Sequence, residues 1–244
     1  MNHLKKQLSS SPCRLAIQQP EHAPWLGFFH KMMHVDIYVY LDNVQFKKRY
    51  FENRNKIRTP DGWIWTTAPV IVKGRYTQNI RDVELTPDHG WKRSYAGRLH
   101  SSYGKSTGSP ELLHWLQETW LPTPHCLLLD MNLSFINYIR NLLFIDTPTL
   151  LASDLTSAKL RGSDLILNIC RRTGANIYIS GPDGRNYLDQ EAFSSAGVKI
   201  KYHDFKPPVY PQMHPGPFLS HMSISDALFN IGPAATRKML KEIS

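Results

Sequence analysis

The chain of 244 residues has few cysteines, no long apolar run and fewer acidic than basic side chains. Its three cysteines, Cys13, Cys126 and Cys170, are far apart and form no CxxC pair. This pattern argues against a disulfide framework and a thiolate zinc site, and it fits a reducing compartment. No stretch approaches the roughly 18 apolar residues of a membrane helix, and no apolar segment of signal-peptide length follows the first lysines. We therefore expect a cytoplasmic protein without membrane insertion.

Common phosphate-binding motifs are also missing. The patterns G-x-x-x-x-G-K-[ST] and G-x-G-x-x-G do not occur in the sequence. The eleven histidines include no H-x-x-x-H pair with an adjacent helical glutamate, so no metal site is expected. These absences weaken the case for a kinase or a nucleotide-binding dehydrogenase of the common type.

A basic excess is what the chain does have. Its 29 lysines and arginines against 20 acidic residues give a net charge of +9. A basic field attracts nucleic acid, anionic lipid or phosphate-bearing small molecules, and charge alone does not choose between them. The densest runs, FKKRY and CRRTG, hold only two or three cations each. Solvated faces and a polynucleotide-binding surface therefore both stay open as interpretations.

The apolar pattern at the start of the chain predicts an α/β fold. RLAIQ at 14–18 and the β-branched, aromatic run at 36–42 are typical of buried strands. Between them, PWLGFFHKMMH predicts a helix that begins near Pro24. A strand, a helix and a strand in this order indicate a Rossmann-like, mostly parallel sheet. Open α/β sheets bind ligands at the carboxyl edge of their strands.

Later segments predict more strands and a helical insertion. WIWTTAPVIV from Trp63 and IRDVEL from Ile80 have strand-like patterns, whereas 43–60 has no clean period and is expected to be an irregular, functional loop. The predicted organisation is a flexible tail at 1–13, an N-terminal α/β half at 14–110 with the ligand loop 43–60, a helical region at 111–175, and a C-terminal α/β half at 176–244 that forms one unit with 14–110.

The loop 43–60 carries the first candidate site. Asp42 ends the preceding strand, and the polar candidates that follow it are Gln45, Lys48, Asn53, Arg54 and Asn55. Arginine holds phosphate or carboxylate through two parallel hydrogen bonds, and amides can bond to sugar hydroxyls or base edges. Three aromatic residues, Phe46, Tyr50 and Phe51, lie among these cations, which favours a binding surface over a merely solvated loop. We predict that the loop binds an anionic ligand and that Asp42 orients an amine or holds a hydroxyl.

His22 is a candidate proton acceptor. It lies in the loop after the first predicted strand, two residues before the helix. An imidazole there can act as a general base or contact a phosphate at the helix N-terminus. The alternative interpretation is a loop histidine that bonds only to the backbone.

Five segments, in order, resemble the successive blocks of the WbqC-like protein family. They are AIQQPEHAPWLGFFHKM, DIYVYLDNVQFKKRYFENRNKIRTPDGWIWTTAPV, IYISGPDGRNYLD, VYPQ and LSHMSISDALFNIGP. The resemblance covers most of the chain from about Arg14 to the last helix. It implies a cytoplasmic tailoring step in the biosynthesis of O-antigen or another surface glycan. The further substrate-binding residues that it implies are Gln19, Lys31, Gly181, Tyr187, Asp189, Tyr210 and Gln212.

With this resemblance, the first hypothesis is a transferase that attaches an amino acid or other acyl group to an amine of a nucleotide-linked sugar. The loop 43–60 would bind the nucleotide-sugar or the acyl donor, and Tyr187 and Asp189 would close the other side of a cleft. His22 or Asp42 would take the proton from the attacking amine. Positioning and proton transfer suffice for acyl transfer, so no metal is required.

Two alternatives remain open. Nucleotidylyl transfer or ATP-dependent ligation would use ATP and Mg²⁺. An RNA-binding module, or a transferase that takes its aminoacyl group from charged tRNA, would use the basic, aromatic loop. Salt dependence separates the RNA hypothesis from a small phosphate-bearing substrate, because binding through many phosphates weakens steeply as salt rises. The sequence leaves the oligomeric state open.

Overall fold

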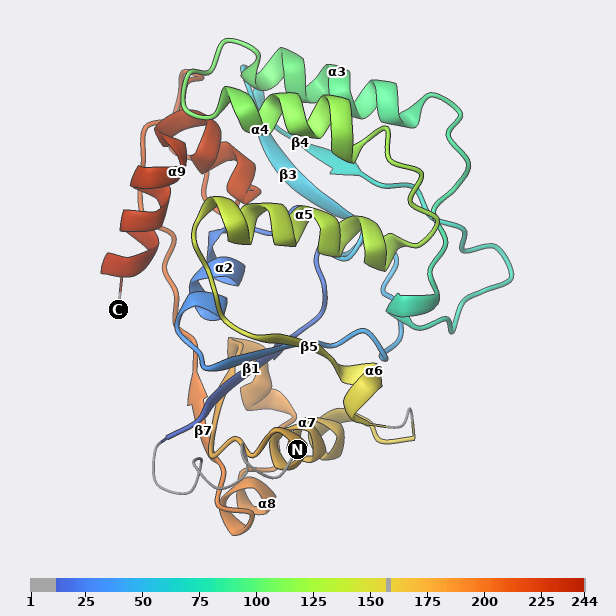
Figure 1. The fold of residues 1–244 in the computed structure, drawn as a ribbon, viewed down its shortest axis with the longest axis vertical. Helices are drawn as coiled ribbons and strands as arrows, with labels where there is room; N and C mark the ends of the chain where they lie inside the picture. The colour runs from blue at the N-terminus through green and yellow to red at the C-terminus, as the bar shows by residue number, and fades with distance from the viewer. Residues whose placement is uncertain (1–11, 157–158, 244) are drawn as a thin grey trace. The chain divides into compact units, whose positions relative to one another are not determined.

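The computed structural model describes residues 12–156 and 159–243, and these residues group into two compact units (Figure 1). The first unit takes its described residues from Met1–Gln19, Lys31–Val44 and Asp146–Asp204. The second comprises Pro20–His30, Gln45–Ile145 and Phe205–Ser244. The boundaries predicted from the sequence, at residues 110 and 175, differ from those of the two units. Residues 1–11 of the predicted tail lie outside the described residues.

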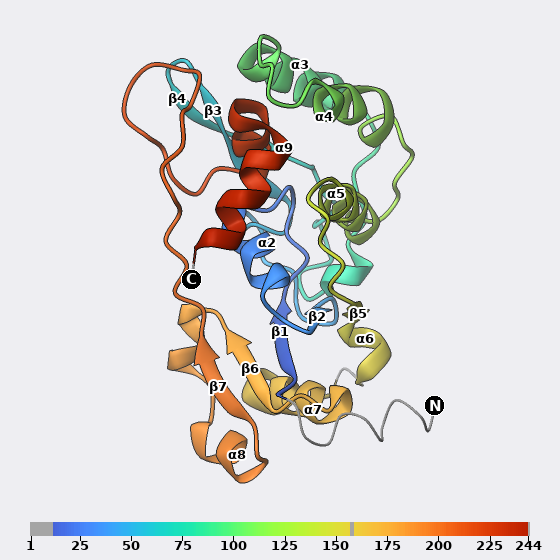
Figure 2. The same cartoon turned by 60° about the vertical axis from the view of Figure 1, so that its left-hand side comes forward.

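A five-stranded parallel sheet of order β5-β2-β1-β6-β7 forms the first unit (Figure 2). The chain runs from β1 outward to β2 and β5, and then returns to the other side of β1 with β6 and β7. This order is that of doubly wound sheets, whose switch point here lies between β1 and β6. It confirms the predicted Rossmann-like α/β fold. The strands are β1 (Arg14–Gln18), β2 (Ile37–Tyr40), β5 (Thr149–Leu151), β6 (Ile177–Ser180) and β7 (Lys199–Tyr202).

Alternate residues of these strands form the core of the first unit. Leu15, Ile17 and Val39 pack in one cluster with Ile169 and Phe193, which come from two helices. Parallel strands need crossover segments, and helices supply them here. The helical elements wholly within this unit are α6 (Ala152–Leu155), α7 (Gly162–Thr173), the short 3₁₀ helix η3 (Pro182–Asn186) and α8 (Gln190–Ser195). Helix α2 (Leu26–Met33) contributes residues to both units.

The second unit combines helices with an antiparallel hairpin. Its core is aromatic: the Trp120 ring centroid lies 5.3 Å from that of Phe135 and 5.7 Å from that of Tyr95. The Trp120 Nε1 donates to the carbonyl of Met131 at 2.9 Å, so its polar atom is satisfied inside the core. The elements are β3 (Arg54–Thr59), β4 (Gly62–Thr67), η1 (Ile80–Asp82), α3 (Trp91–Tyr103), α4 (Pro110–Trp115), η2 (Leu116–Trp120), α5 (Leu128–Leu142) and α9 (Ile224–Glu242).

Two segments of this unit differ from the prediction. The predicted irregular loop contains strand β3, which the apolar pattern missed because two of its buried side chains, Asn55 and Arg58, are polar. The strand predicted from Ile80 does not form. That segment makes a 3₁₀ turn, and after it Glu84 and Leu85 form only isolated bridges, to Leu127 and Val70, which belong to none of the strands of the described residues. None of the helices in the described part of the chain is long and apolar enough to cross a membrane.

Candidate functional site

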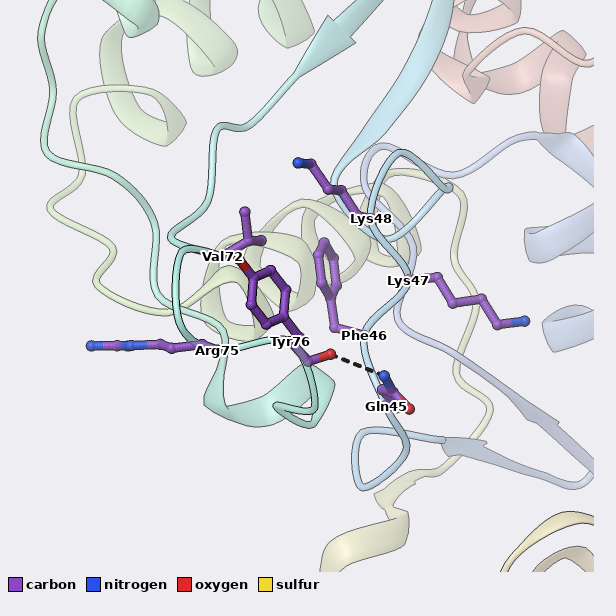
Figure 3. Close-up of a pocket in the computed structure, with 7 residues that line it drawn as sticks. All are labelled: Gln45, Phe46, Lys47, Lys48, Val72, Arg75 and Tyr76. Atoms are coloured by element: carbon purple, nitrogen blue, oxygen red, sulfur yellow. Dashed lines mark hydrogen bonds between the residues drawn. The ribbon is translucent and has the colours of Figure 1, made fainter.

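A basic pocket of about 410 Å³ lies in the second unit, at the beginning of the predicted ligand loop. The Phe46 and Tyr76 rings lie within it, and the charged ends of the three cations point outward from them (Figure 3). Two hydrogen bonds join the segments that form its walls. Gln45 Nε2 donates to the carbonyl of Tyr76 at 2.9 Å, and the Phe46 N–H donates to the carbonyl of Gln78 at 3.0 Å. The lining residues are Gln45, Phe46, Lys47, Lys48, Val72, Arg75 and Tyr76.

The two lysines of the pocket form no ion pair within the described residues. Arg75 is paired with Glu84, but neither Lys47 nor Lys48 takes part in any ion pair found among the described residues. Both lysines are exposed, and Lys47 Nζ lies 5.2 Å from the ring centroid of Tyr50. The pocket therefore combines aromatic surface with lysines that form no ion pair in the described part of the chain. The predicted binding residues Gln45 and Lys48 are brought together here.

Glu52, in the same loop, is a carboxyl group in unusual surroundings. Its side chain is only 1% exposed, and neither carboxyl oxygen has a hydrogen-bond partner in the described part of the structure. Burial raises the pKa of Glu52 from 4.5 to about 7, although the positive charge of Lys47 opposes part of that rise. Carboxyl groups with a strongly shifted pKa are candidate proton donors and acceptors. Sequence reasoning missed this residue, yet it is the single acid in the run from Lys47 to Arg58.

His22 is fully buried in the second unit, with a partner for each ring nitrogen. Nδ1 lies 3.1 Å from Asn132 Oδ1, and Nε2 lies 3.1 Å from the hydroxyl of Tyr95. Asn132 Nδ2 donates to the carbonyls of Pro20 and Glu52, so its Oδ1 is left to accept. His22 must then carry its proton on Nδ1, and Nε2 accepts from Tyr95.

This environment keeps the imidazole neutral. Burial lowers the pKa of His22 from 6.5 to about 4, because the charged form would lose its hydration. Through Asn132, the ring is also joined to the backbone of Glu52. The geometry gives His22 a structural role, and its proposed part in proton transfer stays a prediction.

Two predicted binding residues, Asn53 and Asn55, hold backbone segments together. Asn55 Nδ2 donates to the carbonyl of Ala23 at 2.9 Å, and Asn53 Nδ2 donates to that of Ala68 at 3.1 Å. Both side chains are buried. These bonds hold the loop that contains His22 and the end of the hairpin, and they fix the backbone of Asn53, the residue after Glu52.

Tyr210 and Gln212 lie in the second unit, bonded to a buried aspartate. The Tyr210 hydroxyl and Gln212 Nε2 each donate to Asp226 Oδ2 at 2.7 Å. The Tyr103 hydroxyl donates to Asp226 Oδ1 at 2.8 Å. Burial is the main cause that raises the pKa of both tyrosines, and the negative charge of Asp226 raises it further. Because these donors are engaged inside the unit, substrate binding by Tyr210 and Gln212 stays a prediction.

The switch point of the first unit brings together two more predicted residues, Lys31 and Gly181. The buried Lys31 donates through Nζ to Gln18 Oε1, at the end of β1, at 2.7 Å. A Cβ atom at Gly181, just after β6, would lie 3.8 Å from the same Nζ. Gln19, half-buried, follows β1 at this edge. The ends of β1 and β6 are where doubly wound sheets bind their ligands.

Asp42 follows β2 at the same edge of the sheet and is buried. Its Oδ1 accepts a hydrogen bond from the N–H of Ser153, in the first turn of α6, at 2.9 Å. Its Oδ2 has no hydrogen-bond partner in the described structure. One oxygen thus supports a helix N-terminus, and proton transfer by the other stays a prediction.

Tyr187 and Asp189 follow η3 in the first unit. Tyr187 is 51% exposed, so its ring is accessible to a ligand. Asp189 accepts from the N–H of Ala192 at 3.0 Å and is the N-cap of α8. The predicted cleft between Tyr187 and the loop 43–60 joins residues of the two units and stays a prediction.

Comparison with known proteins identifies the family. A model of the WbqC-like protein family matches residues 19–238. The chain belongs to the WbqC-like protein family. The uncharacterized protein Rv1507c of Mycobacterium tuberculosis (strain ATCC 25618 / H37Rv) is 32% identical over 223 residues, which are 91% of this chain and 95% of that protein. No solved structure matches the chain.

The match to the WbqC-like family confirms the resemblance drawn from the sequence blocks. The matched range includes the basic pocket, Glu52, Lys31 and Gly181, so it draws on both units, and it begins just after β1. This family is associated with tailoring steps in O-antigen and sugar biosynthesis.

Proposed function

We propose that this WbqC-like protein is a transferase that tailors a nucleotide-linked amino sugar, or a similar precursor, by moving an acyl or aminoacyl group onto an amine. The basic pocket carries the proposal. Lys47, Lys48 and Arg75 supply positive charge for a pyrophosphate, while Phe46 and Tyr76 supply apolar surface for a base or sugar. The family's association with sugar biosynthesis supports the same substrate class.

In such a transfer the amine nitrogen attacks the acyl carbon. The N–C bond forms, the bond to the donor's leaving group breaks with its electron pair, and the nitrogen loses a proton. We assign that proton to the carboxylate of Glu52. A pKa of about 7 leaves the group partly ionised at neutral pH and basic enough to accept a proton. His22 and Asp42 are the alternative acceptors predicted from the sequence.

Ligand binding tests the proposal first. The purified protein would be heated with nucleotide-linked sugars, ATP, acyl-CoA and charged tRNA in turn. Nucleotide-linked sugars are expected to raise the melting temperature, because a ligand at about 100 times its Kd adds about 2.7 kcal/mol to the free energy of unfolding. Stabilisation by ATP with Mg²⁺ alone would favour the ligase alternative instead.

Replacing Lys48 with glutamine then locates the site. We expect about tenfold weaker binding of the stabilising nucleotide-linked sugar, measured by calorimetry, because a charge-assisted hydrogen bond to phosphate is lost. Lys105→Gln is the matched control, since Lys105 is an exposed lysine of the same unit that does not line the pocket. Equal affinity in the Lys48 variant and the wild type would place the ligand elsewhere.

A further inference from the structure

The β3–β4 hairpin of the second unit carries cations and tryptophans on one face. In its antiparallel register, Lys56 lies opposite Trp65 and Arg58 lies opposite Trp63. Because side chains alternate along a strand, Arg54 shares the face of Lys56, and Trp63 shares that of Trp65. At one end of this face the guanidinium of Arg58 donates to carbonyls of the 214–217 loop.

Four aromatic rings follow one another along this surface, and we call them the ring row: Trp63, Trp65, Phe51 and Tyr50. Successive ring centroids are 5.5, 6.0 and 5.2 Å apart. Trp63 is 44% exposed and Tyr50 is 46% exposed, so both ends of the row are open to solvent. The two middle rings, Trp65 and Phe51, are half-buried between them. Exposed aromatic patches of this kind mark interaction sites.

Cations accompany the rings. The guanidinium of Arg54 lies 4.1 Å from the ring centroid of Trp65, Lys56 Nζ lies 4.9 Å from that of Trp63, and Lys47 Nζ lies 5.2 Å from that of Tyr50. Arg54 also donates to the carbonyl of Arg49. None of the ion pairs found among the described residues involves Arg54, Lys56 or Lys47. No carboxylate therefore forms an ion pair with these cations in the described part of the chain.

We propose that the ring row is a binding surface for single-stranded RNA. Successive bases would stack on the exposed rings and on the guanidinium plane of Arg54, while Lys47 and Lys56 would contact the phosphates. This inference goes beyond the proposed transferase activity. A mononucleotide covers one ring, whereas the row offers several rings at successive positions. The bases of a duplex stay stacked on each other, so they cannot stack on these rings.

The test uses the full chain and a fluorescein-labelled oligouridine of about 12 nucleotides, within the range bound by one small domain. Fluorescence anisotropy gives the Kd at several salt concentrations between about 50 and 200 mM. We expect saturable binding that weakens with salt. Trp63→Ala should weaken it about tenfold, because one stacked base is lost. Lys56→Gln should reduce the salt slope by about 0.7, as expected for one phosphate contact on a single strand.

Phe144→Ala is the matched control. Phe144 belongs to the same unit, is 70% exposed and has Arg237 5.4 Å from its ring centroid, but it lies outside the ring row. Unchanged affinity in this variant, together with a loss in Trp63→Ala, supports the proposal. Both replaced rings are exposed, so both variants should keep the wild-type melting temperature.

Four results would each overturn the proposal. The first is that the oligouridine does not bind at about 50 mM salt, and the second is that Trp63→Ala binds it as tightly as the wild type does. The third is that an RNA duplex binds as tightly as the single strand. The fourth is that uridine monophosphate displaces the oligouridine at an equal concentration. The last result would reassign the rings to a single nucleotide. Each leaves the proposed transferase function standing, because that function is tested separately with nucleotide-linked sugars and Lys48→Gln.

Discussion

Replacing Asp226 with alanine should lower the free energy of unfolding by about 4 kcal/mol. The fully buried Asp226 carboxylate accepts from Tyr103, Tyr210 and Gln212. Its removal leaves three donors without an acceptor and opens a cavity. Each unsatisfied buried donor costs about 1–3 kcal/mol, and partial rearrangement recovers some of the sum. Urea unfolding at neutral pH, followed by tryptophan fluorescence, measures the change.

Two further variants separate the charge from the hydrogen bonds. Tyr210→Phe removes one donor and leaves the other two in place, so it should cost only about 1 kcal/mol. Asp226→Asn keeps the shape but puts an amide N–H₂ against donors, and its cost should lie between the other two. A decrease in the free energy of unfolding of less than about 1 kcal/mol in Asp226→Ala would show that these hydrogen bonds do not stabilise the second unit. Tyr210 and Gln212 would then again be candidates for ligand binding.

The strands of the first unit could be predicted because their signal is local. β1 and β2 are short apolar runs, and a parallel sheet buries such runs on both faces. The predicted edge of that sheet does bring Lys31 close to Gly181. β3 could not be predicted in the same way. Its buried polar side chains are satisfied by partners far along the chain, such as Ala23 for Asn55.

The candidate site could be predicted only in part, for a related reason. A family motif marks residues that matter, but it does not separate those that bind a ligand from those that bind each other. Lys48 lines an open pocket, whereas Gln212 is bonded to Asp226. Glu52 was missed because its raised pKa arises from burial, which involves segments as distant as that of Asn132. Burial of this kind has no signature in a short run of sequence.

The pH dependence of stability should reverse its sign between a Glu52 variant and a His22 variant. The pKa of Glu52 is raised from 4.5 to about 7, so the folded state keeps a proton that the unfolded state loses, and stability falls as pH rises between these values. The pKa of His22 is lowered from 6.5 to about 4, so stability falls as pH drops between those values. Each effect is on the order of 3 kcal/mol over its range.

In the wild type the two slopes oppose each other between pH 4.5 and 6.5, so the contributions of Glu52 and His22 to the free energy of unfolding should nearly cancel there. Glu52→Gln keeps only the His22 slope and should lose stability on acidification. His22→Gln keeps only the Glu52 slope and should lose stability as pH rises. Urea unfolding at several pH values measures both, and parallel profiles in the two variants would contradict the assignment.

Above pH 7 the Glu52 variant should be more stable than the wild type, because glutamine removes a buried carboxylate whose charge has no hydrogen-bond partner in the described structure. The same change should reduce acyl transfer about 10²–10⁴-fold, since the proposed proton acceptor is gone. A gain in stability together with a loss of activity distinguishes a functional carboxyl group from a structural one, because replacing a structural group would lower both stability and activity. If Glu52→Gln is stabilised at high pH but keeps full activity, the proton acceptor must be sought at His22 or at Asp42, whose buried Oδ2 has no hydrogen-bond partner in the described structure.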